Sequence, residues 1–486
     1  MTTQKKLMTN WRWWLCSLLF VATTVNYLDR QVLSLTYEEF IKPEFHWTDA
    51  HYGTITSFFS IFYAIACLFA GKFVDWMGTK KGYLIAIGVW SAGACMHAAC
   101  GWATSLITGL DVIALRGVEV ASNVALAIST TSVYLFLLCR GILALGEAGN
   151  FPAAIKVTAE YFPKKDRAFA TSIFNAGASV GALAAPLAIP PLASALGWEW
   201  AFIIIGALGF IWMFFWQFMY DKPENSKHVN AAELEYIHQD DAAEAAEKAA
   251  AAEAAKSEPS ISLAKSFTYR QTWAFIVGKF FTDGVWWFFL FWAPSYFSNQ
   301  FNAPATSFLG QALIFTLYAI VTVVSIGGGY LPKIFVEKKG MDPYAGRMRA
   351  MLIFAFFPLC ALLAQPLGVH FNSPWWPAVL IGLAAAGHQA WSANLFSTIG
   401  DMFPKSTIAT ITGIGAMAGG VGSMIIQKVA GNLFTFAETQ GAAFSFLGFE
   451  GKPAGYFIVF CFCGIAYLLA WCIMKALVPA YKPINK

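Results

Sequence analysis

Six charged side chains lie inside long apolar stretches of the sequence, where a charge is costly. Three are acidic and three are basic: Asp29, Arg30, Arg140, Glu147, Lys279 and Asp283. A charge near the middle of a bilayer costs about 2.5–3.5 kcal/mol on insertion scales. Such residues pair with one another or face a cavity, so the set indicates either a structural ion-pair network between helices or a site for a charged ligand.

The spacing of four of these residues favours a site for an anion. Asp29 and Arg30 are neighbours, so a helix turns them about 100° apart, and Arg30 can face a cavity while Asp29 faces another helix. Arg140 and Glu147 are seven residues apart, which places them on one helix face about 10 Å apart. We expect Arg30 and Arg140 at comparable depth, where two guanidiniums can grip a carboxylate. Glu147, deeper in the same cavity, and Asp29 are candidate proton sites.

A second group of candidates lies in the C-terminal part of the chain. Lys279 and Asp283 are spaced i, i+4 and can pair on one helix, and we count Asp283 as a third candidate proton site. Trp287 belongs to an aromatic run, WWFFLFWAPSYF, that offers a stacking surface for a sugar ring. His388, Gln389 and Asn394 fall within seven residues of a later apolar stretch. They are candidate ligand contacts, and a role in helix packing is the alternative.

Catalytic and metal-binding signatures are missing from the sequence. His388 has no His, Cys or carboxylate at ligand spacing, and we expect no metal site. We find no GxSxG, HExxH or Walker motif, so we expect neither an enzyme nor a bound cofactor.

The composition sets the class of protein. Hydrophobic residues make up 58% of the 486 residues and charged residues 12%, against roughly 45–50% and 25% in soluble proteins. This excludes a disordered chain, a disulfide scaffold and a nucleic-acid binder. A spanning helix needs about 20 residues, and we predict an all-α membrane protein with twelve such helices in two groups of six. The predicted spans are 13–35, 52–74, 83–103, 132–154, 168–192, 199–220, 272–297, 308–331, 347–367, 375–399, 407–431 and 454–477.

The positive charges predict the orientation of these spans. With both termini in the cytoplasm, most of the 32 Lys and Arg residues fall on the inner side, and the outer loops hold only Lys42, Arg116 and Lys452. The first outer loop is acidic instead, with Glu38, Glu39, Glu44 and Asp49. The inverse topology would contradict the positive-inside rule.

The chain divides into three parts by composition. We predict a six-helix bundle over residues 1–220, a cytoplasmic loop over 221–271 and a second six-helix bundle over 272–486. The loop contains an Ala/Glu/Lys tract with strong helix propensity and little to bury, which reads as a solvated helix or tether, with a partner-docking helix as the alternative. Residues 104–131 are too polar for a clean span, and we expect an outer insertion packed against the membrane face.

Several motifs together resemble the major facilitator superfamily, and within it the anion:cation symporters. The segment after span 2, GKFVDWMGTKK, is similar to the superfamily's gating motif, through Gly71, Asp75, Gly78, Lys80 and Lys81. NYLDRQVLS in span 1, RGILALGEAGNFPAAIK in span 4, KFFTDGVWWFFLFWAP in span 7 and HQAWSANLFSTIGDMFP in span 10 resemble the hexuronate transporter branch.

The resemblance implies roles for matching residues. It implies that Tyr27, Arg30 and Tyr63 bind the substrate, that Asp29 and Glu147 handle protons, and that Arg140 stands at the motif's arginine. Relatives that carry aldonates have a Gln where we align Ala178 and an Asn where this chain has GIGAMAGG. Both departures favour a hexuronate over an aldonate.

These observations predict a proton-coupled symporter that imports a sugar acid, and we favour glucuronate or galacturonate as its substrate. A proton gradient would supply the energy for uptake, with sodium left open as the coupling ion. The expected setting is a bacterial-type inner membrane, which the chain crosses many times as a monomer in the lipid bilayer. A symporter for another organic anion and a non-transporting sugar-acid receptor are the alternatives. The acid pair Asp29 and Glu147 argues against the receptor, because a sensor has no need of proton sites.

Overall fold

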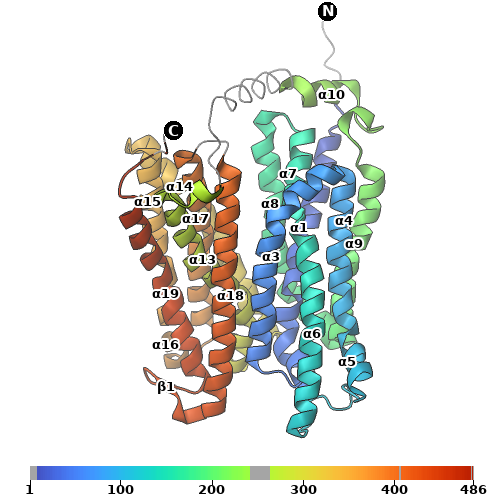
Figure 1. The fold of residues 1–486 in the computed structure, drawn as a ribbon, viewed down its shortest axis with the longest axis vertical. Coiled ribbons are helices and arrows are strands. Elements are labelled where there is room, and N and C mark those ends of the chain that lie inside the picture. Colours follow the sequence, from blue (N-terminus) through green and yellow to red (C-terminus); the bar gives the residue numbers. More distant parts are fainter. Residues whose placement is uncertain (1–7, 241–262, 404–406, 483, 485–486) are drawn as a thin grey trace, which may run out of the picture.

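The computed structural model describes residues 8–240, 263–403, 407–482 and 484. The Ala/Glu/Lys tract falls in the gap at 241–262, so its predicted helix lies outside the described residues. The chain forms two helical bundles that stand side by side (Figure 1). Residues 8–240 make the N-terminal half, and the residues from 263 onward make the C-terminal half.

The N-terminal half consists of long helices joined by short turns. Its elements are α1 (Trp11–Thr36), a π-helical turn η1 (Tyr37–Ile41), α2 (Lys42–Glu44), α3 (Asp49–Met77), α4 (Thr79–Met96), α5 (Cys100–Thr108), α6 (Ser122–Glu147), α7 (Asn150–Tyr161), α8 (Lys164–Leu196), α9 (Trp198–Met219) and α10 (Ala231–Ile237). The C-terminal half repeats the pattern with α12 (Leu263–Ser266), α13 (Arg270–Phe301), α14 (Phe308–Lys333), α15 (Pro343–Ala355), α16 (Cys360–His370), α17 (Trp375–Met402), α18 (Ile408–Gln440), β1 (Ser445–Phe446), β2 (Phe449–Glu450) and α19 (Lys452–Leu477).

Each of the twelve predicted spans falls on one of these helices or on a pair of helices that continue each other. Ten of the helices in the described residues are long and apolar enough to cross a membrane. The two remaining predicted spans fall on α1 and α17, which have 26 and 28 residues. Both helices are long enough to cross a bilayer. Their polar residues lower their hydropathy, and those polar residues include several of the candidate site residues.

Two ends of the molecule can be distinguished. At the Gly78 end, α3 turns into α4, and the beginning of α1, the end of α19 and α10 lie there (Figure 1). At the opposite end, which we call the Glu44 end, lie α2, α5, the beginning of α6 and the β1–β2 hairpin (Figure 1). The charge distribution predicts that the Gly78 end faces the cytoplasm.

The expected insertion at 104–131 is divided between two longer helices. Residues 104–108 complete α5, and residues 122–131 begin α6 ten residues before the predicted start of span 4. The turn between them folds back onto α2, where the Gly117 amide donates to the Pro43 carbonyl at 3.1 Å and Arg116 lies 3.7 Å from Glu44. The charged residues of this segment, Asp111, Arg116 and Glu119, therefore lie in the turn between α5 and α6.

One element departs from the all-α expectation. Strands β1 and β2 pair antiparallel, with Ser445 opposite Glu450 and Phe446 opposite Phe449. The two residues between them, Leu447 and Gly448, both have positive φ, at 47° and 87°. That backbone is the one a tight two-residue hairpin turn requires.

The N-terminal half extends beyond its predicted limit at residue 220. Glu233 on α10 is fully buried and accepts hydrogen bonds from the backbone amides of Trp11 and Arg12, at 3.0 and 3.1 Å. The Arg12 guanidinium also lies 3.0 Å from the same carboxylate. Because the first amides of a helix have no intrahelical partner, Glu233 caps the beginning of α1. The predicted loop therefore starts with a segment that packs as part of the bundle.

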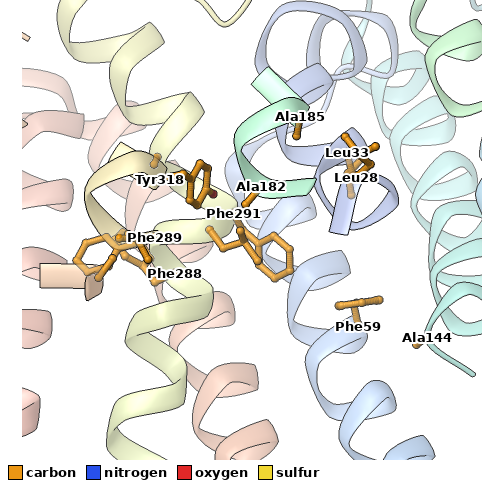
Figure 2. Packing of buried hydrophobic residues seen from close by; sticks show 14 of the residues in the cluster. Leu28, Leu33, Phe59, Ala144, Ala182, Ala185, Phe288, Phe289, Phe291 and Tyr318 are labelled. Atoms are coloured by element: carbon orange, nitrogen blue, oxygen red, sulfur yellow. The ribbon is translucent and has the colours of Figure 1, made fainter. Parts of the chain in front are cut away.

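The two halves meet through a continuous buried core. Figure 2 shows Phe291 and Tyr318 of the C-terminal half near Ala182 of α8, with Phe59 of α3 beyond them. The rings of Phe59 and Phe291 are 6.2 Å apart between centroids. Aromatic packing thus spans the two halves near the middle of the helices.

Candidate functional site

The centre of the site is an ion pair between α1 and α6. The Arg30 Nε and Nη2 groups both donate to one oxygen of Glu147, at 3.0 and 2.7 Å. Both side chains are buried, with Arg30 5% and Glu147 1% exposed. Two bonds from one guanidinium hold this carboxylate in a defined place.

Four aromatic rings surround the Arg30 guanidinium. Its carbon lies 4.8 Å from the ring centre of Tyr63, 5.1 Å from those of Tyr27 and Trp287, and 5.9 Å from that of Phe59. Rings at this distance stabilise a cation. Trp287 comes from α13, so both halves contribute to this aromatic cluster. The structure thus brings together four of the candidate substrate-binding residues, Tyr27, Arg30, Tyr63 and Trp287.

Arg140 lies two turns from Glu147 on α6 and has free hydrogen-bonding capacity. It is 2% exposed, and its guanidinium carbon lies 5.4 Å from the Phe59 ring centre. Within the described part of the chain, its Nε and Nη1 groups find no acceptor. Unsatisfied buried donors of a charged group are costly, so Arg140 is suited to receive an anion.

Asp29 is the second buried carboxyl of the N-terminal half. It is 2% exposed, and among the described residues neither of its oxygens has a hydrogen-bond partner. It lies close enough to Glu147 and Arg140 to interact with both electrostatically. This agrees with the expectation that Asp29 faces span 4.

One detail of the predicted geometry needs correction. The residue spacing predicts Arg30 and Arg140 at comparable depth, with Glu147 about 10 Å deeper in the same cavity. The structure instead pairs Arg30 directly with Glu147. Spacing within one helix does not determine this contact, because it depends on how α1 is rotated against α6. Both guanidiniums still lie over the Phe59 ring, at 5.9 Å for Arg30 and 5.4 Å for Arg140. The predicted anion site and the predicted proton site are therefore in contact.

The charged residues of the C-terminal half pair on a single helix. Lys279 Nζ lies 2.6 Å from an oxygen of Asp283, one turn along α13, as their spacing predicts. Lys279 also lies over the Phe396 ring, 4.5 Å from its centre. Asp283 packs against Gly419 of α18, where an added Cβ would lie 2.1 Å from the carboxylate. Gly419 thus makes room for this ion pair.

His388 is anchored within the C-terminal half. Its Nδ1 lies 2.7 Å from the hydroxyl of Tyr467 on α19, and its ring stacks on Trp286 at 5.5 Å. The Tyr467 hydroxyl in turn donates to the Thr282 carbonyl at 3.1 Å. The Tyr467 hydroxyl has one hydrogen, which it donates to Thr282. It therefore accepts the bond from His388, and His388 donates from Nδ1. These contacts lie on α13 and α19, and Trp286 is the sequence neighbour of Trp287 in the Arg30 cluster.

The two neighbours of His388 in the candidate set differ in burial. Gln389 is half-buried, and Asn394 is buried, with its amide donating to the Ala390 carbonyl of its own helix at 2.8 Å. Sequence reasoning did not single out Phe59 or Tyr467. Phe59 carries no signal that separates it from other apolar residues, whereas a hydroxyl inside the apolar α19 could have drawn attention to Tyr467.

The predicted gating segment forms the turn between α3 and α4. Gly78 has φ +79°, a conformation that favours glycine. Asp75 lies 2.9 Å from Lys156 on α7, and Lys80 lies 2.9 Å from Asp221. Gly71 has open space around it, and Lys81 is exposed. The segment is thus tied to its own half by ion pairs.

The hydrogen bonds and ion pairs that join the two halves, among the described residues, lie toward the Glu44 end. The Tyr52 hydroxyl donates to the Phe291 carbonyl at 2.9 Å, and the Ser57 hydroxyl to the Met424 carbonyl at 2.9 Å. Gly53 and Gly431 let α3 and α18 approach closely, since a Cβ on Gly53 would lie 2.9 Å from the Gly431 Cα. The halves are therefore fastened at this end.

Comparison with known proteins places the fold and the sequence in one family. Residues 19–426 match the model of the Major Facilitator Superfamily. The chain is 27% identical to the hexuronate transporter of Escherichia coli (strain K12), over 91% of this chain and 95% of that protein. It is 26% identical to the probable galactarate/D-glucarate transporter of the same strain, over 92% of this chain and 93% of that protein.

A solved structure has the same overall fold. The inward-facing, occupied structure of a bacterial homolog of the human lysosomal transporter Spinster superposes with a TM-score of 0.66, at 17% identity, over 96% of this chain and 97% of that one. With ten helices long and apolar enough to span a bilayer, the chain is a multi-pass membrane protein. It belongs to the Major Facilitator Superfamily.

Proposed function

We propose that this protein is a proton-coupled symporter that imports a sugar acid, with a hexuronate such as glucuronate or galacturonate as the substrate. The observation that carries the proposal is Arg140, a buried guanidinium with two donors unused in the described chain, beside the Arg30–Glu147 pair. A planar carboxylate matches this fork in shape and charge. The relatives named above, which include a hexuronate transporter, support the choice of substrate.

The charge balance of the N-terminal half supports coupling to protons. Arg30, Arg140, Asp29 and Glu147 are two cations and two carboxyls, all buried. A bound carboxylate would add one negative charge to this neutral set. Because an uncompensated buried charge is costly, proton uptake by Asp29 or Glu147 would restore neutrality. A loaded carrier that is neutral can rearrange within the membrane at lower cost.

The aromatic cluster supports a sugar as the rest of the substrate. Tyr27, Tyr63 and Trp287 lie around Arg30 and can pack against the apolar face of a sugar ring. We assign hydroxyl contacts to Gln389 and Asn394, with His388 held beside them by Tyr467. Because Trp287 belongs to the other half, a ligand at this position would touch both halves.

The arrangement of the halves supports alternating access. Contacts fasten the Glu44 end, so the substrate would leave toward the Gly78 end in this state. Rocking of the halves about a site near the middle of the membrane would then open the Glu44 end. With the orientation that the positive charges predict, uptake proceeds from outside into the cytoplasm across a bacterial inner membrane.

The pairing in the C-terminal half favours a substrate with one carboxylate. Lys279 is a buried cation of that half, and it is already paired with Asp283 at 2.6 Å. A dicarboxylate such as galactarate would have to break that pair. We therefore place monocarboxylate uronates ahead of dicarboxylate sugar acids.

Uptake of radiolabelled sugar acids into proteoliposomes, with the outside more acidic, tests this function. We expect accumulation of glucuronate or galacturonate, and competition by either unlabelled uronate but not by glucose or galactose. A neutral sugar would leave Arg140 unpaired. Arg140→Gln is the matched control, because it keeps polar atoms but removes the charge. Comparable inhibition by neutral sugars, or normal uptake by Arg140→Gln, would overturn the proposal.

A further inference from the structure

The two halves are joined at the Glu44 end by a cluster of charged side chains, which we call the gate cluster. It consists of Glu38, Glu39, Lys42, Asp49 and Lys452. The first four belong to η1, α2 and α3 in the N-terminal half, and Lys452 is the first residue of α19. The cluster lies outside the site described above, and nothing in the proposed function uses it.

Most charges in the gate cluster are paired. Asp49 is fully buried, and its two oxygens lie 2.7 Å from Lys452 and 3.4 Å from Lys42. Lys42 also lies 2.9 Å from Glu38. The Tyr37 hydroxyl donates to Asp49 at 2.8 Å. The Asp49–Lys452 pair crosses between the halves, so it exists only while this end is closed.

Glu39 is the carboxyl that is left without a cation. Among the described residues it forms no ion pair, and its Oε1 atom is buried without a hydrogen-bond partner. The groups that face it across the interface are the Ser298 hydroxyl and the Ala305 backbone, both uncharged, and its charged neighbour along the chain is Glu38.

The charges of the cluster do not balance when all carboxyls are ionised. Three carboxyls share two ammonium groups, and the further acid near Lys452 is Glu438, 3.8 Å away and half exposed. Burial of an unpaired carboxylate between the halves is costly. Burial raises the pKa of the Glu39 carboxyl from 4.5 to about 7, with the charge of Glu38 adding to the rise and the Ser298 hydroxyl opposing it.

We infer that Glu39 is a gate carboxyl, which takes up a proton when the Glu44 end closes and releases it when that end opens. On closing, the carboxylate binds a proton from the surrounding water and is buried as a neutral acid. On opening, water reaches it and it ionises again. The link between Glu39 and import rests on the proposed function, in which the Glu44 end closes behind the incoming substrate. That closure would then depend on external protons.

The direction of the pH dependence follows from linkage. The closed state has the higher pKa and so binds more protons, which means that acid favours closure. The effect is complete below the ordinary pKa of a glutamate, near 4.5, and is lost as the pH rises through about 7. Between these values the ratio of open to closed molecules should rise about tenfold per pH unit.

Thiol labelling measures this ratio without any sugar acid. Ser57→Cys places a thiol at a buried contact between the halves, where Ser57 bonds to Met424, and a membrane-impermeant reagent reaches it when the Glu44 end opens. The variant is made in a background lacking the nine native cysteines. Ile107→Cys, at an exposed position of α5, corrects for the reactivity of the thiol at each pH. The reagent is added to one side of the membrane at a time. Labelling of Ser57→Cys is measured with the reagent on the side from which it modifies Ile107→Cys.

The expected result is a corrected labelling rate that rises about tenfold per pH unit from pH 5 to 7 and levels off above 7. Glu39→Gln, which imitates the protonated acid, should label slowly and equally at every pH. Glu38→Gln is the matched control and should keep the slope. A flat rate in the native background, or a native slope in Glu39→Gln, would overturn the inference. Because no sugar acid is present, failure of uptake in the earlier experiment would leave this result unaffected.

Discussion

The two halves of the molecule hold their buried charges in different ways. In the N-terminal half, Arg30 on α1 reaches Glu147 on α6, and both Arg140 and Asp29 keep polar atoms without a partner in the described chain. In the C-terminal half, Lys279 and Asp283 on α13 pair within one turn of that helix, at 2.6 Å. One half therefore has charges that a ligand can reach, and the other has a closed pair.

The difference indicates where the chemistry of transport takes place. A pair between two helices can be loosened by a ligand or by a shift of either helix, whereas a pair within one helix moves as a unit. Substrate binding and proton uptake should therefore both act through the N-terminal half. The C-terminal half would supply aromatic contacts such as Trp287 and a rigid frame.

The largest expected effect is the loss of Arg30. Arg30→Ala leaves Glu147 buried without its cation, a penalty of about 3–5 kcal/mol when one partner of a buried pair is removed. Substrate binding should be abolished. Arg30→Lys keeps the charge but lacks the planar fork, and we expect binding weakened at least about tenfold. Uptake kinetics in proteoliposomes measure both. Transport by Arg30→Lys at the native level would contradict a role for the two-donor contact of Arg30 with Glu147.

A smaller effect is expected at the closed pair of the C-terminal half. Replacing both partners, Lys279→Gln with Asp283→Asn, removes both charges at once and should leave accumulation driven by a pH gradient within about threefold of the native level. Asp283→Asn alone leaves Lys279 unpaired and should lower the melting temperature more than the double change does. The role of Asp283 in proton coupling stays a prediction from sequence. If the double variant exchanges substrate but no longer accumulates it, that role is supported and the comparison of the halves is wrong.

The smallest effect is expected at Tyr467. Tyr467→Phe removes one hydroxyl that bonds His388 and Thr282, and a single hydrogen bond contributes about 1 kcal/mol. Uronate uptake should lose at most about fivefold in affinity. Equilibrium binding of labelled uronate to the purified protein measures the change. A complete loss of binding would mean that His388 acts at the substrate itself.

The sequence was sufficient for the positions of the helices but less so for their ends. Long apolar runs mark spans because a helix must fill the bilayer with apolar residues. The beginning of α6 at Ser122 was missed, since residues 122–131 mix small and polar side chains beyond the apolar run. The docking of Glu233 on the first amides of α1 was also missed, because 221 residues of chain separate it from Arg12.

The site residues were largely predictable, and their contacts were not. Arg30, Arg140, Glu147 and Asp29 stand out because charges are rare in apolar runs. Whether Arg30 meets Arg140 or Glu147 depends on the rotation of α1 against α6 and on the reach of a long side chain, which residue spacing within one helix does not determine. The approach of Trp287 to Arg30 depends in addition on how the two halves meet.

The most direct test of the account is Glu147→Gln, which separates coupling from binding. Glutamine can still accept hydrogen bonds from Arg30, which now reach the Glu147 carboxylate at 2.7 and 3.0 Å, but it carries no exchangeable acid proton. Proteoliposomes with the variant are tested in two ways, for accumulation of labelled uronate under a pH gradient and for exchange of external against internal uronate. We predict that accumulation is lost and exchange persists, because exchange needs binding and rocking but no proton release. Normal accumulation by Glu147→Gln would contradict the central claim that the N-terminal half couples substrate to protons through this carboxyl.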